Sequence, residues 1–291
     1  MSEVLLAEVN VSEGRDQAKL DRISGALKAV EEIKVIDQNS DKDHNRSVYT
    51  YIGPPEAVLE ATKKLVGEAV KLIDMSAHQG SHPRMGAVDV VPFIPVRNVS
   101  KEKAMEVARA FGQYLGSLGV PVFYYEDCAT RPERKSLVDI RKGEYEALAE
   151  KMGQPQWRPD EGPHAFVPKS GATVTGVRFP LVALNVNLST NNMAVGKKIV
   201  KAVRGAAGGY KNVRAIALEL SDRNLIQVSM NLTNYLETPI HRVFETIKSE
   251  AASFGVGIED CELVGPVPLD AFEDVIKHYL RAHTFNMEQI Y

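Results

Sequence analysis

The sequence predicts an α/β protein with two ferredoxin-like subdomains, each a mixed or antiparallel β-sheet covered by helices. The first observation is that the order strand–helix–strand–strand–helix–strand occurs twice along the chain. The second is a cluster of Pro and Gly between Gly153 and Gly176, typical of a domain junction or a binding loop. The third is size: 291 residues, 44% of them hydrophobic, suffice for two subdomains, expected at residues 1–180 and 181–291.

The first half begins with a β-rich strand at Val4–Val11, followed by apolar residues at helical spacing over Asp16–Val30. Pro54-Pro55 starts a second helix that runs to Leu72, because proline is tolerated in the first helical turn. The other expected elements are strands at Ile33–Ile36, Ser47–Ile52, Val88–Val96 and Val120–Tyr125, a polar turn at Asp37–Asn45, and helices at Lys101–Leu118 and Arg131–Met152.

The second half repeats this alternation without any clear repeat of the residues themselves. Its expected strands are Leu181–Leu188, Val213–Glu219, Leu225–Leu232 and Glu262–Val264, and its expected helices are Met193–Val203, Pro239–Phe254 and Asp270–His283. Two such layers side by side would leave a cleft, and clefts between domains are common ligand sites.

Charge and composition exclude several classes of protein. With 35 Lys and Arg against 38 Asp and Glu, the net charge of −3 argues against a nucleic-acid binder or a membrane-surface protein. No apolar run reaches the ~20 residues of a membrane span, and the N-terminus lacks the basic region of a secretory signal. Cys128 and Cys261 are expected to be free thiols in a reducing compartment. A soluble cytoplasmic protein is predicted.

Common nucleotide and metal motifs are absent. Gly255-Val256-Gly257 lacks the final glycine of a dinucleotide fingerprint, and Asn191 stands where a phosphate-binding loop before Gly196-Lys197 needs glycine. His78 and His82 have the spacing of a helical zinc pair, but Gly80 lies between them and Pro83 follows. No metal site is expected.

His82 is the strongest candidate for a catalytic residue. It lies in a glycine-containing loop between a helix and an apolar strand, and Pro83 favours an extended backbone for it. Histidine has a pKa near neutrality and can both accept and donate a proton within one reaction cycle. The neighbouring Arg84 adds a cation to this loop.

Two other polar segments have both a functional and a plain structural interpretation. Residues 37–46 could be a solvated hairpin loop, yet Arg46 at the strand entrance could bind a carboxylate with two parallel hydrogen bonds. Residues 162–173 could be a linker, yet their Gly, Pro, Phe166 and Lys169 also suit a flat heteroaromatic ligand with an anionic tail.

The string His82-Pro83-Arg84-Met85-Gly86-Ala87, with Asp89 and Pro92-Phe93-Ile94-Pro95-Val96, resembles the formiminotransferase family. The resemblance extends over essentially the whole chain. Further matches are Val9-Asn10, Ser12-Glu13-Gly14, residues 45–50, residues 162–173, Ala183–Leu188 and Gln227–Leu232.

The resemblance implies transfer of a formimidoyl group from N-formimidoyl-L-glutamate to tetrahydrofolate, a step of histidine breakdown and one-carbon metabolism, in a folate tunnel between the two subdomains. It implies that His82 is the acid/base catalyst. Arg46 and Arg84 are candidates for substrate binding from their charge and their positions in these loops. The segment implied to bind folate comprises Pro163, His164, Ala165, Phe166, Val167, Pro168, Lys169, Ser170, Gly171 and Ala172. It also implies a homodimer, no metal, and a separate cyclodeaminase protein, because the chain resembles only the transferase part of the bifunctional formimidoyltransferase-cyclodeaminases.

Three alternative functions remain compatible with these residues. The same fold could transfer a formyl group between glutamate and folate, because formyl and formimidoyl differ only by O in place of NH. A non-catalytic folate-binding protein is a second alternative, against which His82 argues. An interaction module built on ferredoxin-like domains is the third, and it would bind no folate.

Overall fold

The computed structural model describes residues 3–290 and divides the chain into two compact units, Met1–Arg178 and Phe179–Tyr291. Each unit has its own β-sheet and its own hydrophobic core. The two thiols, Cys128 and Cys261, are free, as expected.

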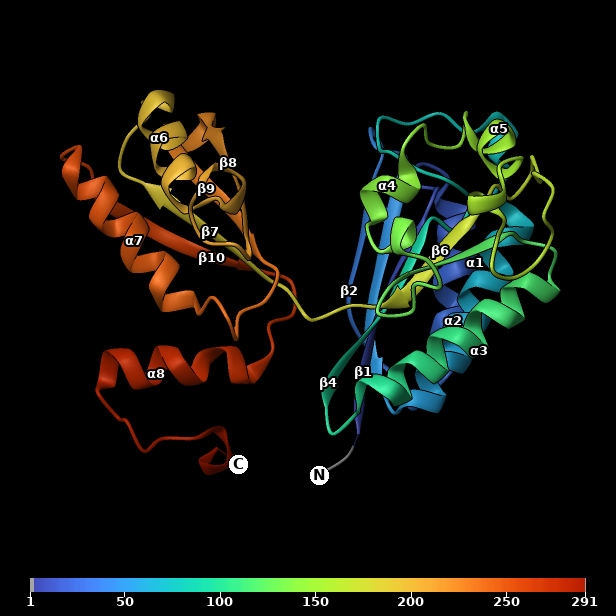
Figure 1. Ribbon diagram of the computed structural model, residues 1–291, viewed down its shortest axis with the longest axis horizontal. Helices are drawn as coiled ribbons and strands as arrows, with labels where there is room; N and C mark the ends of the chain where they lie inside the picture. The colour runs from blue at the N-terminus through green and yellow to red at the C-terminus, as the bar shows by residue number, and fades with distance from the viewer. Residues whose placement is uncertain (1–2, 291) are drawn as a thin grey trace. The chain divides into compact units, whose positions relative to one another are not determined.

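The first unit is built on a six-stranded mixed sheet (Figure 1). In the order in which they lie side by side, its strands are β2 (Lys34–Asp41), β3 (Arg46–Gly53), β1 (Val4–Val11), β4 (Val90–Arg97), β6 (Thr173–Val177) and β5 (Val122–Glu126). β1 is antiparallel to β3 and β4, whereas β6 is parallel to both β4 and β5. The first four strands therefore form the expected ferredoxin-like sheet, and β6 and β5 extend it.

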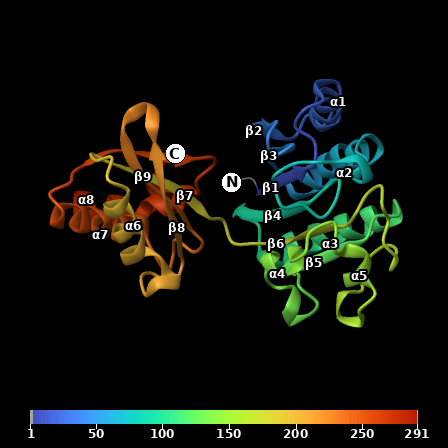
Figure 2. The same ribbon diagram turned by 90° about the horizontal axis from the view of Figure 1, so that it is seen from above.

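Helices cover both faces of this sheet. Three long helices, α1 (Gln17–Lys28), α2 (Pro55–Leu72) and α3 (Lys101–Ser117), lie side by side (Figure 2). Two short helices, α4 (Leu137–Arg141) and α5 (Leu148–Met152), belong to the other face. Alternation along β5 shows this: Tyr124 points into the core beneath the long helices, and Phe123 packs with Ile140 and Leu148.

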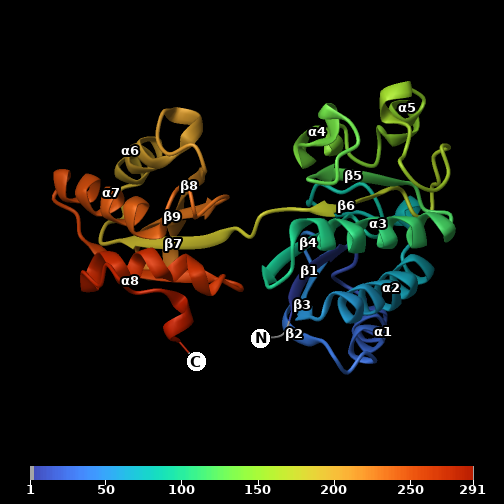
Figure 3. The same cartoon turned by 60° about the horizontal axis from the view of Figure 1, so that its bottom comes forward.

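The second unit has a four-stranded antiparallel sheet. In the order in which they lie side by side in the sheet, its strands are β10 (Ile258–Val264), β7 (Val182–Leu188), β9 (Leu225–Leu232) and β8 (Val213–Leu220). Its helices are α6 (Met193–Val203), α7 (Ile240–Ser253) and α8 (Glu273–Leu280), with α7 beside both α6 and α8 (Figure 3). Val186, Val228, Ile199 and Ile247 are fully buried in one core, which places α6 and α7 on the same face of the sheet.

The α/β class with two ferredoxin-like sheets is confirmed, but three local expectations were wrong. The Pro/Gly-rich stretch is not all linker, because it contains β6, a buried strand between β4 and β5. Arg131–Met152 is not one helix: Gly143, with φ +87°, separates α4 from α5. The polar turn is shorter than expected, since β2 continues to Asp41. Among residues 3–290 no helix is long and apolar enough to cross a bilayer.

Candidate active site

The loop that carries His82 is held tightly against the turn between β2 and β3. Asn45, which has a positive φ of 48°, donates its side-chain amide to the Gln79 carbonyl at 2.9 Å. A Cβ on Gly80 would lie only 2.3 Å from the His44 carbonyl oxygen, so this close approach requires glycine. The backbone just before His82 is thereby fixed relative to the first residue of β3.

That first residue, Arg46, contacts the His82 ring directly. Arg46 Nη1 lies 2.8 Å from His82 Nε2 and 3.5 Å from the side-chain oxygen of Asn10 in β1. A guanidinium group has donors and no acceptor, so Nε2 of His82 must accept this hydrogen bond through its lone pair. The proton of the neutral ring therefore lies on Nδ1.

The surroundings of His82 favour its neutral form. Burial lowers the pKa of His82 to about 4, and the nearby charge of Arg46 acts in the same direction. Arg141 and His44 lower it further. At neutral pH the ring is thus an uncharged base, which is the protonation state needed to accept a proton.

A buried ion pair lies behind this contact. Asp89, the residue before β4, is 1% exposed; it accepts the Met85 N–H at 2.9 Å and pairs with Arg141 at the end of α4. Burial raises the pKa of the Asp89 carboxyl, and the Arg141 guanidinium opposes that rise. The sequence motif included Asp89 but gave no sign of Arg141, whose helix reaches Asp89 only through the fold.

Two other histidines near His82 have different surroundings. His78 uses both ring nitrogens, since Nε2 donates to the Asn45 carbonyl at 3.0 Å and Nδ1 accepts from Arg84 Nε at 3.4 Å. His44 is exposed, with Nδ1 2.9 Å from Asp41 Oδ2, and its ring meets that of His82 edge-on at 6.2 Å. His78 thus ties the loop to the hairpin, whereas the partner of His82 Nε2 is Arg46, a long side chain that can move.

Arg84 is engaged by acidic side chains. Its guanidinium donates two hydrogen bonds to Glu146, at 2.9 and 2.6 Å, and a third to Glu144 at 3.3 Å. It also lies over the Tyr145 ring, 5.8 Å from the centroid. A substrate carboxylate would have to compete with these two glutamates for Arg84, whereas Arg46 has no carboxylate bonded to it among the described residues.

The end of the segment Pro163–Ala172 runs against the His82 loop. The Ala87 N–H donates to the Ser170 carbonyl at 2.8 Å, and the Ala172 N–H donates to the Met85 carbonyl at 3.0 Å. Gly171 has φ +62°, and a Cβ there would lie 2.2 Å from the Met85 oxygen. The structure therefore joins two segments that the sequence treated as separate candidates.

The middle of that segment packs against neighbouring elements of the first unit. The Phe166 ring lies 5.4 Å from the Tyr145 ring, and Tyr145 donates its hydroxyl to the Pro168 carbonyl at 2.7 Å. Lys169 donates its ammonium to the Lys71 carbonyl in the last turn of α2, at 3.3 Å. Phe166 is half-buried, and His164, Ala165, Pro168 and Lys169 are exposed.

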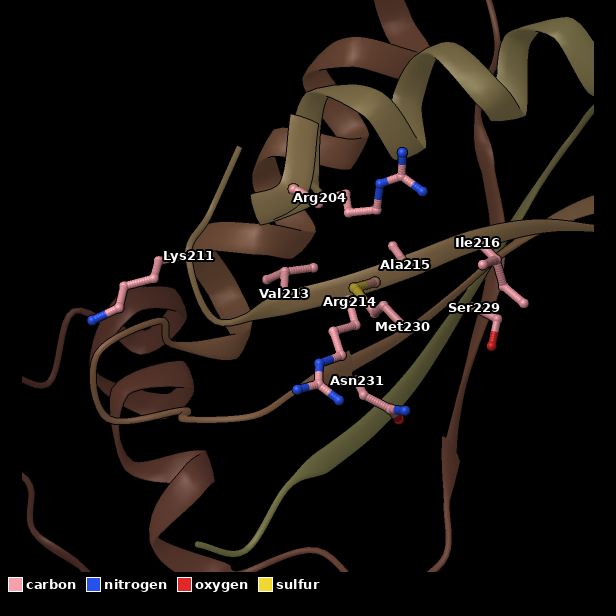
Figure 4. A pocket seen from close by; sticks show the side chains of 10 residues that line it. Arg204, Lys211, Val213, Arg214, Ala215, Ile216, Ser229, Met230 and Asn231 are labelled. Carbon is pink, nitrogen blue, oxygen red and sulfur yellow. The ribbon is translucent and has the colours of Figure 1, made fainter. Parts of the chain in front are cut away.

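The second unit has a surface hollow of about 540 Å³ beside β8, lined by Arg204, Lys211, Arg214 and Asn231 among others (Figure 4). Arg204 and Arg214 lie on opposite sides of the strand and Lys211 extends away from both, so the three cations do not converge on one point. None of them was a candidate from the sequence. Among residues 3–290, no group of three or more His, Cys, Asp or Glu is arranged to hold a metal ion.

Comparison with known proteins gives matches along both units. A model of the formiminotransferase domain, N-terminal subdomain, matches residues 4–178, and one of the formiminotransferase domain matches residues 183–289. The chain is 42% identical to a glutamate formimidoyltransferase of Streptococcus pyogenes over 98% of this chain and 96% of that one. It is 43% identical to one of Thermoplasma acidophilum, covering 95% and 92%. A mouse formimidoyltransferase-cyclodeaminase is 44% identical over 96% of this chain but only 53% of its own length.

Proposed function

The chain belongs to the formiminotransferase family, and we propose that it transfers the formimidoyl group from N-formimidoyl-L-glutamate to tetrahydrofolate. The products are 5-formimidoyltetrahydrofolate and L-glutamate, in cytoplasmic histidine degradation and one-carbon metabolism. The observation that carries the proposal is the neutral His82, whose Nε2 bears a lone pair and lies beside a cation able to bind a carboxylate. The hydrogen-bonded junction with residues 170–172 adds support.

His82 is the proposed acid/base catalyst. N5 of tetrahydrofolate attacks the formimidoyl carbon, and the resulting tetrahedral adduct must lose a proton from N5. The glutamate nitrogen must gain a proton before the C–N bond breaks. A neutral histidine can take the first proton and deliver it to the second nitrogen, which typically accelerates a reaction ~10²–10⁴-fold. The pKa of His82, lowered to about 4, prepares the ring to accept the proton first.

The remaining roles are assigned by chemistry and position. Arg46 is the preferred substrate-carboxylate ligand, with Arg84 as a second contact that would require Glu144 or Glu146 to move. The segment Pro163–Ala172 is proposed to bind folate, through backbone polar groups and the apolar side chain of Phe166. Arranging both substrates in one site supplies the orientation that bimolecular transfer needs.

Two wider proposals rest on family membership alone. We propose that the chain forms a homodimer, and that a separate cyclodeaminase protein releases ammonia from the product. The glutamate formimidoyltransferases of Streptococcus pyogenes and Thermoplasma acidophilum support the second proposal, because the match covers 96% and 92% of their lengths. The chain spans about half the length of the relatives named formimidoyltransferase-cyclodeaminase. Formyl transfer on the same scaffold is the alternative activity, because the two donors differ only by O in place of NH.

A turnover assay with tetrahydrofolate and either N-formimidoyl-L-glutamate or N-formyl-L-glutamate tests the proposal. We expect kcat/KM to be higher with the formimidoyl donor. His82→Ala is compared with the wild-type protein and with His283→Ala, which removes an exposed histidine outside the proposed site. Faster turnover of the formyl donor would replace the proposed activity with its alternative, and no turnover of either donor would refute both.

A further inference from the structure

The base nitrogen of His82 is covered in this structure. Arg46 Nη1 lies 2.8 Å from Nε2, so the lone pair that would accept a proton from the substrate already accepts one hydrogen bond. The Nδ1 side of the ring carries the proton and has no lone pair to offer. His82 as it stands can accept a proton only after Arg46 moves.

The charges around His82 are unbalanced. Burial lowers the pKa of the half-buried Arg46 guanidinium, and the nearby charge of Arg141 lowers it further. Among the described residues, only Asp89 forms an ion pair with either arginine. The Nε atoms of both arginines are buried and have no hydrogen-bond partner. A buried donor without a partner is unfavourable, and most such groups in native structures are satisfied by some partner. Two cations against one carboxylate leave room for one more anion.

We propose that one carboxylate of the amino-acid donor binds between Arg46 and Arg141, draws Arg46 away from Nε2 of His82, and so uncovers the base only when the donor is present. A carboxylate fits because it is a monoanion whose two oxygens match the donor pair of a guanidinium group. That the carboxylate belongs to the amino-acid donor rests on the proposed function, whereas the carboxylate site itself rests on the two arginines. Arg141 then helps to bind the donor carboxylate, and it acts on His82 only through Arg46, as a positioning residue.

A second effect follows from the same displacement. A carboxylate near the ring offsets the positive charges that face it, from Arg46 on β3, Arg141 on α4 and His44 on the hairpin. Asp89 and Asp41 are already paired with Arg141 and His44. Binding of the carboxylate should therefore raise the pKa of His82 and help the ring to hold the transferred proton until it is delivered.

The test uses L-glutamate, the proposed product, with the full-length protein and no folate. His82 ring resonances are followed by NMR as pH varies, with and without glutamate, and assigned by their loss in His82→Gln. We expect glutamate to raise the pKa of His82 in the wild type. We expect Arg141→Gln to weaken glutamate binding by about 10–100-fold, the range for lost charge-assisted hydrogen bonds. Lys142→Gln, which removes an exposed positive charge next in sequence, is the matched control.

Because Arg141→Gln leaves Asp89 without its partner, the double variant with Asp89→Asn is measured too; it should show the same weakened binding in a folded protein. An unchanged pKa of His82 at saturating glutamate overturns the inference, as does equal weakening in Lys142→Gln. The proposed function can fail independently. A pKa response without turnover of either donor would refute only the activity, and turnover without the pKa response would refute only the uncovering of His82.

Discussion

Replacing Arg46 with glutamine is expected to raise the pKa of His82 in the protein without ligand. The change removes a positive charge that touches the ring and keeps a polar, though shorter, side chain. Burial is the larger cause of the lowered pKa and remains in the variant, so the pKa should rise from about 4 but stay below the value of ~6.5 for a free histidine.

The size of the rise follows from Coulomb's law. With Nη1 and Nε2 2.8 Å apart, the charge centres of the two groups lie roughly 4 Å apart, a separation that gives about 4 kcal/mol at an effective dielectric constant of 20 and about 1 kcal/mol in water. His82 is only half-buried, so solvent screens the pair and the lower part of that range applies. A rise of about 1–2 pH units is expected, since one unit corresponds to ~1.4 kcal/mol.

NMR titration of the His82 ring measures this shift. Arg15→Gln is the control, because Arg15 is an exposed arginine that donates to the Lys42 carbonyl at 2.7 Å on the same hairpin and has no bond to His82. The control should move the pKa of His82 by less than about 0.3 units, as expected for a screened surface charge. A similarly small shift in Arg46→Gln would show that Arg46 does not hold the ring, and the reasoning on both the base and its uncovering would be wrong.

His82→Ala should leave folate affinity largely intact and lower kcat at least ~10²-fold in steady-state assays; near-normal activity would make His82 structural. Between pH ~6.5 and about 4, His82 is protonated in the unfolded chain but neutral in the folded protein, so the free energy of unfolding should fall as pH falls through that window. Urea unfolding of His82→Gln should show a weaker pH dependence. Lys169→Glu should weaken binding of polyglutamylated folate more than monoglutamylated folate, with a gap that shrinks above ~0.15 M salt; equal losses in Kd would leave Lys169 only its contact with the Lys71 carbonyl. Gly171→Ala should lower the free energy of unfolding by at least ~2 kcal/mol, because of the positive φ of Gly171 and its close approach to Met85. An unchanged Tm would show that alanine is accommodated there without strain.

Alternating apolar residues and helical spacing were enough to predict most elements, including both ferredoxin-like sheets. β6 was missed because its five residues include Gly176 and follow a run of Pro and Gly, and burial on both sides of the sheet leaves no alternation to recognise. Gly176 belongs in the strand because a Cβ there would lie 2.3 Å from the Tyr125 carbonyl oxygen of the neighbouring strand. Only the tertiary structure supplies that neighbour.

The same limit applies to the site. His82 could be found from the sequence because Pro83 and the adjacent arginine mark its loop, and Arg46 because it begins a strand. Arg141 could not, since it ends a five-residue helix inside a charged stretch that resembles any solvated surface. Its role depends on Asp89, whose carboxylate is buried only once the chain has folded. A buried carboxylate is unfavourable without a cation beside it, and Arg141 is that cation.

His82, Arg46, Arg141 and the segment Pro163–Ala172 all belong to the unit that ends at Arg178. The groups proposed to handle the proton and the donor's carboxylate are therefore inherited together on one continuous stretch of the gene. Recombination near codon 178 would exchange the second unit between relatives without separating these groups. A chimaera with this chain's first unit should accordingly keep its donor preference and its pH–rate profile, whichever relative supplies the rest.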